Sequence, residues 1–110
     1  MIKVVFDAPQ ERIASFTLSG HANFAKKGSD IVCAGVSAVS FGAVNAIMSL
    51  TDVEPEIEQG REAAIFAAPF RGIFSPESEE KVQLLLNGML ISLQTIERDY
   101  GKYMKIILNQ

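Results

Sequence analysis

The chain contains one histidine and one cysteine, His21 and Cys33, and both lie in one short segment that also holds two glycines. A thiol is a strong nucleophile only as the thiolate, and an imidazole is the side chain best suited to take its proton near neutral pH. Because neither residue has a second copy, chemistry that combines a cysteine with a histidine of this chain must use this pair. This segment is therefore the first place to look for function.

The residues around the pair predict a loop that leads into a helix. Glycine, asparagine and serine within 19–30 favour irregular backbone, and the uncharged run over 31–50 predicts a helix. Either Ser29 or Asp30 is expected to cap this helix. Cys33 would then lie in the first helical turn, where unpaired backbone N–H groups and the helix dipole favour an anion.

Two further side chains are expected to support the pair. Asp30 could cap the helix or orient His21, and Ser37 follows Cys33 by one helical turn, on the same face. A lone cysteine in an apolar helix is commonly a small buried hydrophobe, and a lone histidine is commonly a surface or structural residue. The residues alone therefore leave both a catalytic and a structural interpretation open.

The loop between the two residues is expected to bind substrate. Gly20 and Gly28 would allow it to close over a bound peptide and bring His21 to the thiol. Phe24, inside this loop, is a candidate for an apolar substrate pocket. Core packing is the favoured interpretation for two other phenylalanines near predicted loops, Phe70 and Phe74.

The composition is that of an ordinary globular protein, with 48% hydrophobic and 21% charged residues among 110. We expect a single domain over 1–110, because this length supports one core but not two. The net charge of −3 gives no basic surface for direct nucleic-acid binding. One cysteine cannot form an intrachain disulfide or a cysteine-based zinc site, and it fits a reducing cytoplasm. Neither a metal nor a cofactor is expected.

The uncharged run over 31–50 is long enough to cross a bilayer. It also contains serines and an asparagine, and it lies between segments that are predicted to be strands. We therefore expect a buried core helix and no membrane contact. The first residues of the chain lack the basic and apolar regions of a secretory signal.

Hydrophobic patterning along the chain predicts five strands and two helices. A serine followed by proline and glutamate, Ser75–Glu77, is typical of a helix start. The predicted strands cover 2–6, 12–18, 53–59, 62–68 and 102–108, and the helices run from about 30 to 50 and from 75 to about 99. The order ββαββαβ indicates an α+β fold in which two helices pack on a mixed β-sheet as a two-layer sandwich.

Two motifs in the histidine–cysteine segment resemble the signature of the ribosomal-processing cysteine protease family (Prp). The first is Gly20-His21-Ala22, and the second is Gly28-x-Asp30-Ile31-Val32-Cys33-Ala34-x-Val36-Ser37. The predicted order of elements is also similar to that family over essentially the whole chain. One departure is Gly35, where such proteins often have alanine.

The resemblance implies a bacterial cytoplasmic endopeptidase that acts as a homodimer. Members remove a short N-terminal extension from a large-subunit ribosomal protein, so the implied partner is that precursor. Carried onto matching positions, Cys33 is the nucleophile, His21 is the general base, and Asp30 and Ser37 are supporting residues. Two other classes stay open: a thiol redox sensor and a noncatalytic ribosome-associated binding module.

Two surface patterns have both a structural and a functional interpretation. Small residues recur at every fourth position of the first helix, at Ala34, Ala38, Gly42 and Ala46. Packing against the second helix is the default, and a subunit contact is the alternative. Acidic residues alternate along the next segment, at Asp52, Glu54, Glu56 and Glu58. They are expected to form a solvated strand face, or to steer a basic precursor toward the enzyme.

Overall fold

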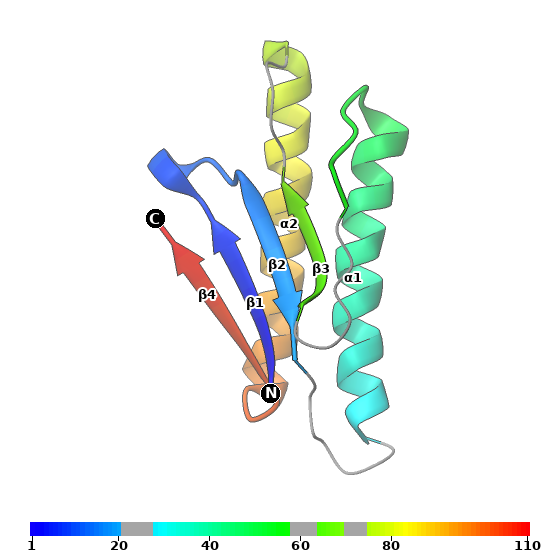
Figure 1. Cartoon of the computed structure of the whole chain (residues 1–110), viewed down its shortest axis with the longest axis vertical. Coiled ribbons are helices and arrows are strands. Elements are labelled where there is room, and N and C mark those ends of the chain that lie inside the picture. Colours follow the sequence, from blue (N-terminus) through cyan, green and yellow to red (C-terminus); the bar gives the residue numbers. More distant parts are fainter. Residues whose placement is uncertain (21–27, 58–63, 70–74) are drawn as a thin grey trace.

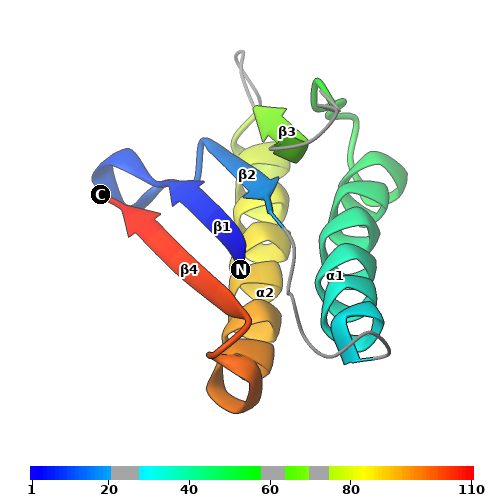
Figure 2. The same cartoon turned by 60° about the horizontal axis from the view of Figure 1, so that its bottom comes forward.

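The computed structural model describes residues 1–20, 28–57, 64–69 and 75–110, with side chains over 1–20, 31–57 and 75–110. Four strands and two long helices form two layers, and both helices lie on the same side of the sheet (Figure 1, Figure 2). The elements are β1 (Ile2–Asp7), a short 3-10 helix η1 (Pro9–Glu11), β2 (Ser15–Ser19), α1 (Gly28–Leu50), β3 (Ala64–Pro69), α2 (Pro76–Tyr100) and β4 (Met104–Asn109). The α+β two-layer class is thus confirmed.

The sheet is mixed, as predicted, with the strand order β3-β2-β1-β4. β1 pairs antiparallel with β2 and parallel with β4, and β2 pairs antiparallel with β3. β3 and β4 are therefore the edge strands. At β4 the backbone N–H of Ile106 donates to the Glu97 carboxylate of α2 at 2.7 Å. This contact satisfies one edge donor, which reduces the exposure of that edge to further pairing.

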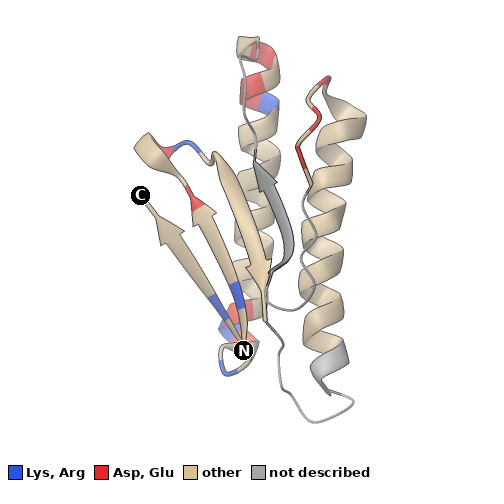
Figure 3. Ribbon diagram, viewed as in Figure 1, with Lys and Arg blue, Asp and Glu red and all other residues tan. Residues whose placement is uncertain are grey.

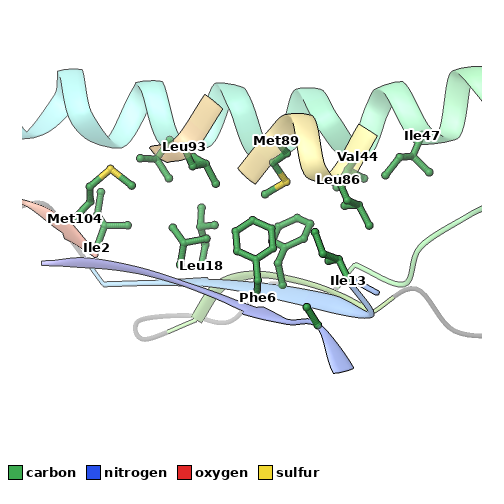
Figure 4. Packing of buried hydrophobic residues seen from close by; sticks show 14 of the residues in the cluster. Ile2, Phe6, Ile13, Leu18, Val44, Ile47, Leu86, Met89, Leu93 and Met104 are labelled. Carbon is green, nitrogen blue, oxygen red and sulfur yellow. The ribbon is translucent and has the colours of Figure 1, made fainter. Parts of the chain in front are cut away.

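The core lies between the helices and the sheet (Figure 4). Alternate residues of β1 and β2 point into it, because side chains on a strand alternate between the two faces. Phe6 and Phe16 pair directly across these strands, with ring centroids 5.9 Å apart. The buried residues of α2 recur at helical spacing and pack onto this face: Val82, Leu86, Met89 and Leu93. The apolar face predicted for the second helix is confirmed.

Directional contacts attach α2 to the strand layer. The Gln83 side chain accepts a hydrogen bond from the Ile13 N–H at 2.9 Å and donates one to the Ile13 carbonyl at 2.8 Å. One turn earlier, the Arg12 guanidinium forms a two-point ion pair with the Glu79 carboxylate. Together these contacts fix the segment before β2 against the first half of α2.

The strand predicted over 53–59 was wrong over its described part. Residues 53–57 belong to no strand or helix, although Val53 and Pro55 are buried while Glu54 and Glu56 are exposed. Alternating burial therefore arises here without a paired strand among the described residues. Pro55 has no N–H to donate to a ladder, and we had expected it at the outside of a sheet. The described acidic residues of this row are exposed, and Asp52 also accepts a hydrogen bond from Ser78.

α1 contributes a single stripe to the core, whereas we had expected a buried helix. Its buried residues are Val32, Val36, Ser40, Val44 and Ile47. From Ile31 to Leu50 the helix has a mean hydropathy of 1.9, so by length and composition alone it could cross a membrane. Only 28% of this segment is buried inside the protein. Its remaining surface is uncharged, as Figure 3 shows for the described part of the helix.

The small-residue stripe on α1 does not pack against α2. Ala34, Ala38 and Gly42 are exposed, and a Cβ added at Gly42 would meet nothing within 4 Å. The contact with α2 involves a different side of α1, where a Cβ at Gly35 would lie 3.6 Å from Ile96. The default interpretation of the stripe was therefore wrong, and its alternative, a subunit contact, stays a prediction.

Candidate active site

Cys33 is the sixth residue of α1 and is partly buried. It packs against the core cluster, next in sequence to the fully buried Val32. The sequence had suggested Ser29 or Asp30 as the cap, which would have placed Cys33 in the first turn. Instead the helix begins at Gly28 and includes both residues, because small polar residues in succession do not define a unique starting point.

Although Cys33 lies beyond the first turn of α1, the direction of its side chain brings the thiol back toward the helix start. The Cα–Cβ bond of a residue in an α-helix tilts toward the helix N-terminus, so the Cys33 thiol leans back toward the preceding turn. That turn carries the N–H groups that have no partner within the helix. Cys33 thus lies next to Val32, which packs in the core, and close to the N-terminal turn, whose backbone N–H groups have no partner within the helix.

Hydroxyl groups continue the same side of α1. Ser37 follows Cys33 by one turn and is partly buried, as the prediction of a supporting residue requires. Ser40, which the sequence analysis did not single out, follows Cys33 by two turns and is fully buried. Its hydroxyl has no hydrogen-bond partner in the part of the chain that the structure describes. Buried hydroxyl groups are normally satisfied, so this one is unusual.

Gly20 occupies a backbone conformation that favours glycine. It follows β2 directly and has φ +84°. A Cβ at this position would lie 2.3 Å from the carbonyl oxygen of Met1. Both observations explain why the first motif begins with glycine. The close contact could not be predicted from the sequence, because Met1 lies far from Gly20 along the chain.

Two predicted site residues lie outside the described residues. These are His21 and Phe24, and the core positions expected for Phe70 and Phe74 lie outside the described residues as well. Gly28 is described as the first residue of α1, and Asp30 has a described backbone within the same helix but no described side chain. The structure therefore places Gly20, Cys33 and Ser37 of the predicted site, and the pairing of His21 with Cys33 stays a prediction.

The comparisons with known proteins decide the family. The family model described as "Cysteine protease Prp" matches residues 1–105. The chain belongs to the Prp family of cysteine proteases. It is therefore an enzyme of the hydrolase class, which favours the protease among the three classes that the residues left open.

Relatives of known name share both sequence and fold with this Prp family member. The ribosomal processing cysteine protease Prp of Bacillus subtilis is 48% identical over 97 residues, covering 88% of this chain and 87% of the relative. The crystal structure of the Staphylococcus aureus Prp with a covalently linked product peptide is 36% identical, with a TM-score of 0.85, and covers 99% of this chain and 100% of the other. A second structure of that protease, with a substrate peptide, is 35% identical with a TM-score of 0.83, at the same coverage.

The one departure from the Prp motif is compatible with the packing. A Cβ at Gly35 would meet Ile96 at 3.6 Å, which is an ordinary van der Waals distance. Both the glycine of this chain and the alanine common in the family therefore fit between α1 and α2. The departure leaves the position of Cys33 unaffected.

Proposed function

We propose that this cysteine protease removes the N-terminal extension of a large-subunit ribosomal protein precursor, with Cys33 as its nucleophile. The observation that carries the assignment of Cys33 is that a cysteine protease with one cysteine has one choice of nucleophile. Its partial exposure beside a buried helical stripe supports this role, because a nucleophile must be both held and accessible. The substrate class is supported by the relatives, which are named as ribosomal processing proteases.

The proposed reaction has two steps. In the first, His21 takes the proton of the Cys33 thiol, the sulfur attacks the carbonyl carbon of the scissile peptide bond, and His21 gives this proton to the departing amine as the C–N bond breaks. A thioester between Cys33 and the N-terminal product results. In the second, His21 removes a proton from water, which attacks the thioester, releases the carboxylate product and regenerates the thiol. Backbone N–H groups at the start of α1 are the proposed donors to the oxyanion of both steps.

Two residues are proposed to support this pair. Asp30 belongs to the first turn of α1 and precedes Cys33 by three residues, which suits a carboxylate that orients His21. Ser37 lies one turn beyond Cys33, partly buried, and suits a hydrogen bond to the bound peptide or to the site. Their assignment follows the Prp motif, in which both positions match.

We also propose that the enzyme works as a homodimer in the cytoplasm, without direct contact with nucleic acid or membrane. The outer face of the helical layer supports the dimer, because it is uncharged on α1 and exposes apolar side chains on both helices. The exposed fraction is 63% for Ile31, 72% for Leu84 and 63% for Ile91. Apolar patches exposed in this way commonly mark protein contacts. Ala38→Arg should yield a monomer in light scattering, whereas Lys105→Glu, on the face of the sheet away from the helices, should not. A dimer that survives Ala38→Arg contradicts this interface.

The proposed nucleophile is tested with precursor protein that carries the extension. Cys33→Ala and Cys33→Ser should each lower the cleavage rate at least about 10³-fold, because the covalent step is lost. Circular dichroism of both variants controls for folding. Ser92→Ala, at an exposed serine of α2, is the matched control and should cleave at the normal rate. Unimpaired cleavage by both Cys33 variants would overturn the assignment.

A further inference from the structure

Gly20 lies at the point where the chain leaves the sheet and enters the segment that contains His21. Ser19, its predecessor, still belongs to β2 and pairs with Lys3 of β1. Gly20 itself has φ +84°, a conformation that residues with a side chain rarely adopt. The direction in which the chain departs from the sheet is therefore set at this one residue.

A second feature prevents any side chain at this position. A Cβ on Gly20 would lie 2.3 Å from the Met1 carbonyl oxygen and 3.3 Å from the Met1 carbonyl carbon. The first distance is far shorter than a van der Waals contact, so one of the two segments would have to move. The contacts of the Met1–Ile2 peptide determine which of the two segments moves.

The peptide group between Met1 and Ile2 is held from its other side. Its N–H, which belongs to Ile2, donates to the Tyr103 carbonyl at 2.9 Å. The Ile2 side chain is 2% exposed within the core, and Ile2 pairs in parallel register with Met104 of β4. Moving the carbonyl away from Gly20 would break this hydrogen bond and disturb packing at the start of β1. The segment after β2 is therefore the part that gives way.

We propose that Gly20 is a positioning residue for His21, braced by the Met1–Ile2 peptide. In this proposal Gly20 acts through the backbone, because it sets the direction in which the chain leaves β2 toward His21. This inference rests on the proposed function, in which His21 is the general base. A substitution that turns this exit by even a small angle displaces the imidazole, and a displacement of about 1 Å in a catalytic group can cost 10²-fold in rate.

The experiment is a double-mutant cycle with two readouts in the full chain. Gly20→Ala, His21→Ala and the double variant are compared for kcat and KM on a precursor peptide. The rate at which iodoacetamide alkylates Cys33 is the second readout, because it stays measurable when turnover is lost. Gly88→Ala is the matched control, since a Cβ there meets nothing within 4 Å.

We expect Gly20→Ala to lower kcat by about 10- to 100-fold with KM changed less than about twofold. It should slow alkylation of Cys33 as much as His21→Ala does, and it should have no further effect on alkylation when His21 is already alanine. Gly88→Ala should leave both readouts unchanged. A residue that acts only through His21 must behave in this non-additive way.

Three results would overturn the inference. The first is a normal kcat in Gly20→Ala, and the second is an equal additional loss of alkylation rate when Gly20→Ala is added to His21→Ala. The third is loss of the folded state by circular dichroism, which would make Gly20 a residue of the fold alone. A different result concerns the proposed function. Normal cleavage by His21→Ala would remove His21 as the base, and the role of Gly20 would fall with it.

Discussion

The two long helices lie side by side on one face of the sheet, yet they are held in different ways. α2 has a serine cap, Ser75, whose side chain accepts from the Ser78 N–H, and its polar side chains bind the segment before β2 and the strand β4. α1 has no charged residue between 31 and 50, and its described part is held mainly by one apolar stripe. The helix with several polar contacts to the strand layer supports the fold, and the helix held mainly by its apolar stripe carries Cys33.

This difference leaves the polar groups of α1 available for chemistry. Three side chains of α2 form hydrogen bonds with the strand layer: Glu79, Gln83 and Glu97. On α1, Cys33 and Ser37 are partly exposed, and the Ser40 hydroxyl has no partner among the described residues.

The largest expected effect on stability comes from the α2 core face. Leu86→Ala should lower the free energy of unfolding by about 2–5 kcal/mol, because Leu86 is fully buried and its removal leaves a cavity between α2 and the sheet. Leu84→Ala is the matched control, with both variants compared in the Ala38→Arg background that removes the proposed dimer contact. That side chain is 72% exposed in the single chain, so its loss should change stability by less than about 0.5 kcal/mol. Urea denaturation measures both, and equal effects would contradict the packing described.

A smaller effect is expected from the amide that joins α2 to the segment before β2. Gln83→Ala should lower the free energy of unfolding by about 1–3 kcal/mol, because the Ile13 N–H and carbonyl both lose their partner. Gln94→Ala, at an exposed position of the same helix, should be nearly neutral. Amide exchange at Ile13 should also become faster in the first variant only, and unchanged exchange would show that this contact does not form in solution.

The smallest effect is expected at the buried hydroxyl of α1. Ser40→Ala should leave stability unchanged or raise it by up to about 1 kcal/mol, because it removes a buried polar atom that has no partner. Ser92→Ala, on the exposed face of α2, gives the reference for the exchange of serine by alanine in a helix. If Ser40→Ala lowers the free energy of unfolding by more than about 1 kcal/mol relative to that reference, the Ser40 hydroxyl forms a hydrogen bond. That result would contradict the difference described between the two helices.

The second helix and the last strand were predictable because local signals agree there. Ser75 and Pro76 mark the helix start, and apolar residues at helical spacing define its buried face. The prediction over 53–57 was wrong because acidic and apolar residues alternate there, a pattern that is typical of a strand. Coil that buries alternate residues has the same pattern as a strand, and only pairing with a neighbouring strand, which is lacking here among the described residues, distinguishes the two.

The candidate site was predictable in its residue types but not in its supports. Cys33 could be found because it is the only cysteine and lies near the start of a long run of uncharged residues. The brace on Gly20 could not, because it depends on Met1 and Tyr103, which lie far from it in sequence and meet it only through the β2-β1-β4 order of the sheet. The exposed stripe on α1 was misassigned for a similar reason, since sequence periodicity does not say which face meets the neighbouring helix.

The central claim is that Cys33 is the nucleophile of a peptide-cleaving enzyme. It is tested most directly by incubating the protein with a precursor-derived peptide that carries an electrophile at the scissile carbonyl, and then locating the adduct by mass spectrometry. The account predicts one peptide per chain, attached at Cys33, with precursor cleavage lost in proportion to the adduct formed. Complete cleavage activity in protein fully modified at Cys33, or no adduct under conditions where free precursor is cleaved, would contradict it.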